Sequence, residues 1–119
     1  MANPNIRQLV TMTGNTAVMN VTTQFANLVS NGVASSSLYR VVMLSAVNIT
    51  DAFVANVSID LVRNSANYSL IKGLTIPFNG AITVLTKDSA LYLVEGDTIQ
   101  CKASANANVQ VICSYEVLA

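Results

Sequence analysis

The side chains that carry most enzyme chemistry are scarce in this sequence. It has no histidine, so the commonest general base, the Ser-His-Asp and Cys-His arrangements and the commonest transition-metal ligand are all missing. Its five glycines are scattered and form no phosphate-binding loop. We therefore expect no catalytic residue, no metal site, no cofactor and no enzymatic activity. The remaining candidates for chemistry are two cysteines and two neighbouring carboxylates.

The two cysteines, Cys101 and Cys113, have eleven residues between them, which is not a zinc-ligand spacing. If the last two strands form a hairpin in which residue i pairs with residue 214 − i, the two side chains face each other on an apolar face. This register allows a cross-strand disulfide. Two buried free thiols are the alternative, because cysteine packs like a small hydrophobe. Assembly in a reducing cytoplasm favours the thiols.

The two carboxylates, Glu95 and Asp97, flank Gly96. Their oxygens are of the kind that Ca²⁺ prefers, but two carboxylates are few for a tight site. A Glu-Gly-Asp tripeptide is also good turn chemistry. We therefore interpret these residues as a turn between two strands.

Length and charge indicate a single small domain that carries no net charge. Its 119 residues and 12.6 kDa fit one domain over residues 1–119, with residues 1–7 as a possible N-terminal arm. Six basic and six acidic residues give no net charge, which argues against electrostatic binding of nucleic acid. No apolar run is long enough for a membrane span, and the first residues do not form a secretory signal.

The composition points to a surface that other subunits cover. Charged residues make up 10% of the chain, against about 25% in a typical soluble domain. Polarity comes instead from 13 Asn, 11 Ser and 10 Thr, while 52% of the residues are hydrophobic. We expect a homo-oligomer, either a trimer or a dimer. An ordinary neutral sandwich rich in Asn and Thr is the alternative.

Alternation with period two dominates the chain and predicts strands. It is clearest over Asn56–Arg63, where Val57, Ile59 and Leu61 point one way. The pattern predicts an all-β, single-domain, two-sheet β-sandwich of jelly-roll or immunoglobulin-like type, with about nine short antiparallel strands. The other expected strands cover 8–13 (ending at Gly14-Asn15), two pieces of 17–30, 38–49, 68–72, 74–78, 81–87, 91–94, 98–103 and 109–117.

Two of these segments carry further expectations. The strand over Leu38–Ile49 is apolar on both faces, so it lies between two layers or at a subunit contact. One face holds Val42, Leu44 and Ala46, and the other holds Val41, Met43 and Val47. Asn79-Gly80 is the pair that a type I′ turn requires, and it predicts a hairpin between residues 74–78 and 81–87, with Pro77 at a sheet edge.

Possible partner contacts fall in two groups. Tyr39 and Tyr68 lie near predicted strand starts, where aromatic side chains can contact a partner at the rim, and Val41 and Met43 lie on the second apolar face of their strand. The N-terminal arm can reach a neighbouring subunit or a shell, through Asn3, Pro4, Asn5, Ile6 and Arg7. The absence of tryptophan disfavours carbohydrate binding.

Two stretches resemble small virion structural proteins of tailed bacteriophages, nearest to those of phages that infect cyanobacteria. The first comprises residues 1–6 (MANPNI), 14–18 (GNTAV) and 20–23 (NVTT). The second comprises residues 87–101 (KDSALYLVEGDTIQC), 103–106 (ASAN) and 113–116 (CSYE). Together they cover about a third to a half of the chain, and residues 38–76 match by pattern only.

This resemblance implies a non-enzymatic β-sandwich of the virion, assembled in the host cytoplasm. A capsid decoration, or cement, protein is the role we expect, with the major capsid protein or other virion proteins as partners. A tail, neck or fibre component that binds a receptor or partner is the alternative. A third interpretation is a trimeric jelly-roll module that binds a ligand through its loops.

Overall fold

A computed structural model describes residues 12–50, 53–86, 88, 91–104 and 108–119. Within these residues the chain forms nine strands and no α-helix, which confirms the all-β prediction. The strands are β1 (Met12–Asn20), β2 (Ala26–Ser30), β3 (Leu38–Asn48), β4 (Ala55–Arg63), β5 (Ala66–Ile76), β6 (Ala81–Leu85), β7 (Leu91–Leu93), β8 (Thr98–Ala103) and β9 (Val109–Leu118). No helix in the described part is long and apolar enough to cross a membrane.

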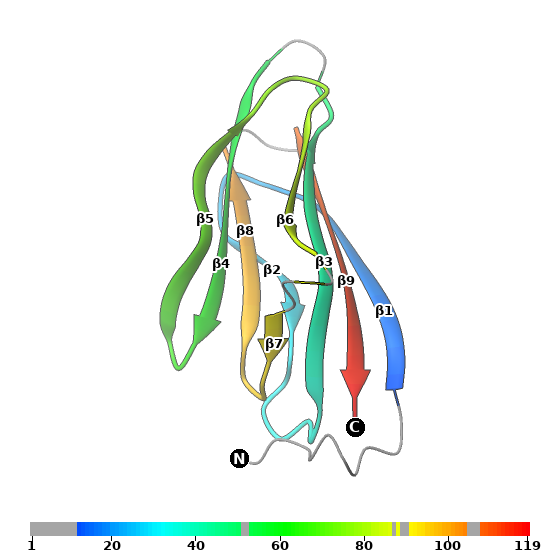
Figure 1. Cartoon of the computed structure of the whole chain (residues 1–119). Coiled ribbons are helices and arrows are strands. Elements are labelled where there is room, and N and C mark those ends of the chain that lie inside the picture. The colour runs from blue at the N-terminus through cyan, green and yellow to red at the C-terminus, as the bar shows by residue number, and fades with distance from the viewer. Residues whose placement is uncertain (1–11, 51–52, 87, 89–90, 105–107) are drawn as a thin grey trace.

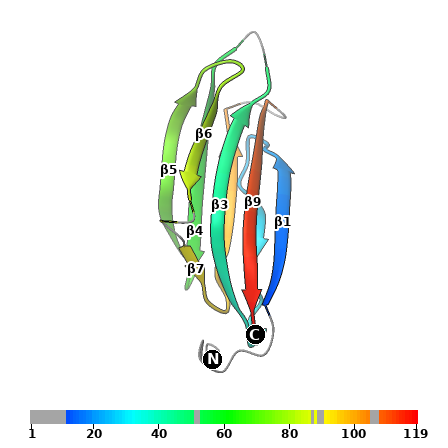
Figure 2. The ribbon, with the colours of Figure 1, turned by 45° about the vertical axis from the view of Figure 1, so that its right-hand side comes forward.

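Two antiparallel sheets pack face to face in an elongated sandwich (Figures 1 and 2), with extents of 50 × 26 × 19 Å. Sheet A has the order β1-β9-β3-β6, and β7 also pairs with β3; sheet B has the order β2-β8-β4-β5. The pairing is nested: the first strand pairs with the last, the second with the next to last, and so inward to β4 with β5. This is jelly-roll topology, with β6 and β7 as two pieces of one strand, and it excludes the immunoglobulin-like order.

The core lies between the two sheets and follows the alternation of the strands. In β4, Val57 and Ile59 are fully buried, and Leu61 continues the same face. Leu44 in β3 and Val111 in β9 meet them from sheet A and are also fully buried. The strand predicted from alternation over residues 56–63 is thus confirmed, together with the face that it buries.

A β-bulge in β3 corrects the predicted division of its faces. Successive residues of β9 pair with Val41 and Met43, so Val42 is the extra residue. The bulge moves Val41 to the inner face beside Leu44 and Ala46, and all three are fully buried. The prediction that Val41 contacts a partner is therefore wrong, because its side chain is in the core.

The start of the chain departs from the predicted boundaries. β1 runs through Gly14-Asn15, where the prediction ended a strand, and it pairs with β9 without a break from Met12 to Asn20. The long ladder with β9 outweighs the turn preference of these two residues. Residues 8–11 of that predicted strand lie outside the described residues. The next stretch does contain two strands, the end of β1 and all of β2, separated by residues 21–25.

The predicted hairpin around Asn79-Gly80 is also wrong. Its first arm is the end of β5 in sheet B, whereas β6 belongs to sheet A. The Gly80 amide donates to the Pro77 carbonyl at 2.9 Å, and Asn79 has φ 56°. A positive φ at the third turn position is typical of a type II turn, which asparagine tolerates. This turn carries the chain from one sheet to the other.

Candidate functional site

The outer face of sheet A carries no net charge in the described residues. We define it as the side chains of β1, β9, β3 and β6 that point away from sheet B, as the register and the alternation place them. They are Met12, Gly14, Thr16, Val18, Asn20, Gln110, Ile112, Ser114, Glu116, Leu118, Leu38, Arg40, Val42, Met43, Ser45, Val47, Ala81 and Thr83, of which Leu38 and Leu118 are buried.

The two charges on this face neutralise each other. Arg40 Nε donates to Glu116 Oε1 at 2.7 Å, and the Arg40 Nη2 group bonds the same oxygen. This hydrogen bond raises the pKa of Arg40 above its ordinary value. The rest of the face is apolar or carries neutral amides and hydroxyls.

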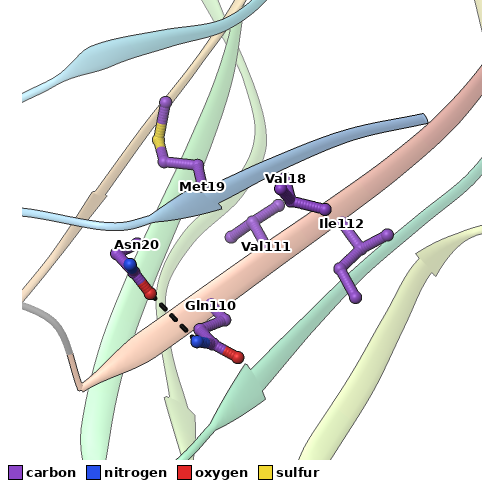
Figure 3. A pocket seen from close by; sticks show the side chains of 6 residues that line it. All are labelled: Val18, Met19, Asn20, Gln110, Val111 and Ile112. Carbon is purple, nitrogen blue, oxygen red and sulfur yellow. Dashed lines mark hydrogen bonds between the residues drawn. The ribbon is translucent and has the colours of Figure 1, made fainter. Parts of the chain in front are cut away.

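Those neutral polar groups are already paired across the strands. Asn20 accepts a hydrogen bond from Gln110 at 3.0 Å, as Figure 3 shows, and Thr16 and Ser114 share one at 3.1 Å. Each of these four groups keeps one hydrogen bond when a partner covers it. Removing this face from water therefore costs less than removing a charged one.

Apolar side chains project between the polar pairs. Val18 is 71% exposed and Met12 is 63% exposed. A single exposed apolar side chain is ordinary, but several exposed apolar side chains on one sheet face mark a contact surface. Val18 borders a shallow depression of about 330 Å³, lined by Val18, Met19, Asn20, Gln110, Val111 and Ile112 (Figure 3). A second depression, of about 370 Å³, lies over Thr16, Arg40, Val42 and Ser114.

The outer side of sheet B is different, because charged residues lie on it. Lys102 and Lys72 are exposed, and the Lys102 ammonium lies 4.8 Å from the centre of the Phe25 ring. Asp60 points the same way and is nearly buried, with the Asn67 amide 3.4 Å from its carboxylate. Hydration of the two lysine ammonium groups opposes burial of this side, so a partner can cover the outer face of sheet A at a lower desolvation cost than the outer face of sheet B.

The predicted turn at Glu95-Gly96-Asp97 is confirmed, and its carboxylates act in packing. Asp97 is 1% exposed and accepts hydrogen bonds from Arg63 Nε at 3.0 Å and from the Val94 amide at 2.9 Å. Glu95 accepts one from the Ser36 amide at 3.3 Å. The guanidinium of Arg63 therefore occupies the place where a cation would neutralise Asp97, and the hydrogen bond raises the pKa of Arg63.

A buried asparagine that the sequence reasoning missed holds this end of the sandwich together. Asn31 is fully buried, and its side-chain amide donates to the carbonyls of Ser37 at 3.0 Å and Leu93 at 2.9 Å. Its backbone amide donates to the Asp97 carbonyl at 2.9 Å. At the far end, Asn48 has the same role and donates to the Ile76 carbonyl at 3.0 Å. Only their positions at strand ends could have suggested these roles.

The cysteines lie in different sheets, so the hairpin register predicted for them is wrong. Cys101 is in β8, which pairs with β2 and β4, and Cys113 is in β9, which pairs with β1 and β3. Both side chains are fully buried free thiols. Burial raises the pKa of each thiol to about 12, so neither is a nucleophile near neutral pH.

The remaining predicted contact residues are not brought together. Met43 lies half-buried on the outer face of sheet A, whereas Tyr68 is 57% exposed on β5 in sheet B. Tyr39 stacks on Tyr115 with ring centres 5.1 Å apart, at the border of the core. The predicted contacts over residues 3–7 lie outside the described residues.

Comparisons with known proteins show the fold. No family model and no curated protein matches the chain. A structure described as "Bacillus endospore appendages form a novel family of disulfide-linked pili" aligns with a TM-score of 0.54 at 10% identity, covering 100% of this chain and 96% of that one. A structure described as "Acidic stable capsid structure of Helicobacter pylori bacteriophage KHP30" aligns with a TM-score of 0.48 at 11% identity, covering 93% and 90%. At these identities the likeness concerns the fold alone.

Proposed function

We propose that this protein is a non-enzymatic structural subunit of a phage particle that decorates and stabilises the outer shell of the capsid. The observation that carries the proposal is the outer face of sheet A, which spans four strands and whose two charged residues neutralise each other. The partners are the major capsid protein or other virion proteins, and the protein is located in the virion.

The energetics of burial support a contact on this face. Each Å² of apolar surface removed from water contributes roughly 25 cal/mol, and a stable interface covers about 800 Å² on each partner. The exposed side chains of Val18 and Met12 supply apolar area, and the paired amides and hydroxyls each keep one hydrogen bond when covered. A decoration protein needs a broad, weakly charged face of this kind, because it must lie against a shell.

The absence of histidine and the packing roles of the buried carboxylates support a protein without enzymatic activity. Among the described residues, no three acidic or cysteine side chains gather into a metal-binding group. The sequence resemblance to small virion proteins of tailed phages points to the particle, and to phages of cyanobacteria in particular. The jelly-roll fold is compatible with this role but does not single it out, since it hosts many functions.

A tail or fibre component remains the second candidate, on the strength of one feature. Large apolar side chains are exposed at the end of the sandwich where the loops after β3 and β5 meet: Ile49, Phe53, Val54 and Phe78. The Asn79 amide ties these loops together by donating to the Thr50 carbonyl at 3.0 Å. An apolar tip on a long, narrow sandwich suits a subunit that touches its partner end-on.

Binding to shells that lack this protein tests the proposal. Ser45→Lys places a charge in the middle of the outer face of sheet A, and Ser69→Lys places the same charge on exposed β5 of sheet B. We expect S45K to lose most of its occupancy in co-sedimentation, while S69K binds like the unmodified protein. Equal binding of both variants would contradict the proposed face. Loss of binding in Phe78→Ser, with the binding of S45K unaffected, would favour the apolar end of the sandwich as the contact surface.

A further inference from the structure

Three of the four sheet edges carry features that discourage pairing with another chain. β2 and β6 are short, at five residues each, and each has a register shift in its ladder. β5 is long, but its ladder with β4 shifts twice, Lys72 is exposed on it, and Gly73 adopts φ 59°. Short strands, bulges and edge lysines are the devices by which native sheets prevent edge-to-edge association.

The fourth edge, β1, has none of these devices. It is nine residues long, pairs with β9 in an unbroken register, and contains no charged residue and no proline. In the described part of the chain no strand pairs with its other side, and Figures 1 and 2 show it at the border of sheet A. Most of its residues are exposed. A regular, uncharged edge left open in this way is a surface for adding a strand.

We propose that β1 pairs antiparallel with β1 of a second copy of this chain, about a two-fold axis at Thr16. Thr16 is the middle of Met12–Asn20, so this register overlaps all nine residues of the two strands. Residues that face each other then satisfy i + j = 32, and Val18 lies opposite Gly14 of the second copy. Because a Cβ added at Gly14 would meet no atom within 4 Å, there is open space there for the valine.

The pattern of β1 is what identifies a second copy as the occupant. A two-fold axis brings the same patch of both subunits together, so the patch must complement itself. In this register the exposed Val18 meets Gly14, and no like charges oppose each other because the strand has no charge. The pairing would join two copies of sheet A into one sheet and double the outer face described above.

Charge-swap variants measured in solution, without particles, test this pairing. We expect the full chain to be a dimer by light scattering and Thr16→Lys or Thr16→Glu to be a monomer, because each variant puts like charges at the axis. An equimolar mixture of T16K and T16E is expected to regain the dimer mass. Ser30→Lys is the matched control: like Thr16, Ser30 shares a hydroxyl bond with a neighbouring strand, at 3.0 Å to Thr98.

A cross-linking variant covers the case in which the charged variants fold poorly. Thr16→Cys is expected to form a disulfide-linked dimer under mild oxidation, and Ser30→Cys is not; the native thiols are buried and stay unreactive. A monomeric full chain would overturn the pairing, as would a dimer in T16K. A full chain that is monomeric but dimerises when residues 2–11 are deleted would show that its own N-terminal segment covers the edge. Particle binding is measured separately, so failure of the dimer leaves the proposed function standing.

Discussion

Arg63 and Asp97 form a side-on ion pair that joins β4 to the turn before β8. Arg63 Nε lies 3.0 and 3.1 Å from the two carboxylate oxygens, and Nη2 lies 2.5 Å from one of them. The carboxylate side chain is 2% exposed, whereas the guanidinium side chain is 40% exposed. The guanidinium therefore compensates the buried charge of the Asp97 carboxylate. The ion pair also holds the turn between β7 of sheet A and β8 of sheet B against β4.

Removing the guanidinium should destabilise the fold. We expect Arg63→Met to lower the free energy of unfolding by about 2–3 kcal/mol, because it leaves the buried carboxylate of Asp97 without its charged partner. Urea denaturation measures this loss. Lys72→Met removes the same charge from an exposed position and should change stability by less than about 0.5 kcal/mol. Equal effects of the two substitutions would contradict the role of the ion pair.

The buried side-chain amide of Asn31 should contribute about as much to the free energy of unfolding as the ion pair of Arg63 does. Asn31→Ala removes the donor to the Ser37 and Leu93 carbonyls and the acceptor for the Ser35 hydroxyl, which lies 2.6 Å away. We expect a loss of about 2–4 kcal/mol in the free energy of unfolding. Asn27→Ala is the control, because Asn27 is exposed and its side chain accepts a hydrogen bond from the exposed side of the sheet, from Gln100 at 3.2 Å. Thermal or urea unfolding that ranks the two variants equally would refute this assignment.

The turn between β5 and β6 requires glycine at position 80. A Cβ added there would lie 2.8 Å from both the Pro77 carbonyl oxygen and the Pro77 Cγ. Because a backbone atom cannot move aside cheaply, Gly80→Ala should destabilise by about 1–3 kcal/mol. At Gly32 an added Cβ meets nothing within 4 Å, so Gly32→Ala should be neutral or stabilise by up to about 1 kcal/mol. A melting temperature for G80A at or above that of G32A would be inconsistent with this turn geometry.

The buried thiols predict how stability depends on pH. Both thiols have a pKa of about 12 in the folded protein, whereas an exposed thiol ionises near about 8.5. The folded chain then holds protons that the unfolded chain releases, so the free energy of unfolding is full below about pH 8.5 and falls as the pH rises toward 12. Urea denaturation at pH 8 and pH 10.5 measures this fall.

The double variant Cys101→Ala/Cys113→Ala supplies the control for the pH effect. Its stability should decline less between the two pH values, because the thiols no longer titrate. A fall that is equally steep in both proteins would contradict the assignment. A disulfide between the two cysteines would show itself by a pH dependence that steepens only after reductant is added.

The alternation of side chains predicted some strands closely, although β5 is one strand where two were predicted, over residues 68–72 and 74–78. Thr98–Ala103 was predicted from its pattern and is β8 with the same bounds, and Val57, Ile59 and Leu61 are buried as expected. These features depend on neighbours in sequence, which is why a local pattern reveals them. The charge-poor composition predicts a surface that other subunits cover, but it does not indicate which sheet carries that surface, because the composition contains no information on strand pairing.

Which strand pairs with which could not be predicted in this way. Nested pairing places β8 and β9 in different sheets, so the two cysteines that a hairpin would align belong to different ladders. The same holds for Asn79-Gly80, which lies at a crossing between sheets and not in a hairpin. The bulge at Val42 could not be predicted, because β3 carries apolar residues on both of its faces. A shift of one residue therefore exchanges one apolar side chain for another and leaves no trace in the pattern.

Side-chain footprinting of the protein on and off the particle tests the central claim most directly. Hydroxyl-radical labelling of the free chain and of the particle-bound chain should show protection at Met12, Val18 and Ile112 on the outer face of sheet A, and unchanged labelling at Tyr68 on sheet B. Protection of Tyr68 with undiminished labelling of the sheet A residues would contradict the claim that the outer face of sheet A binds the shell.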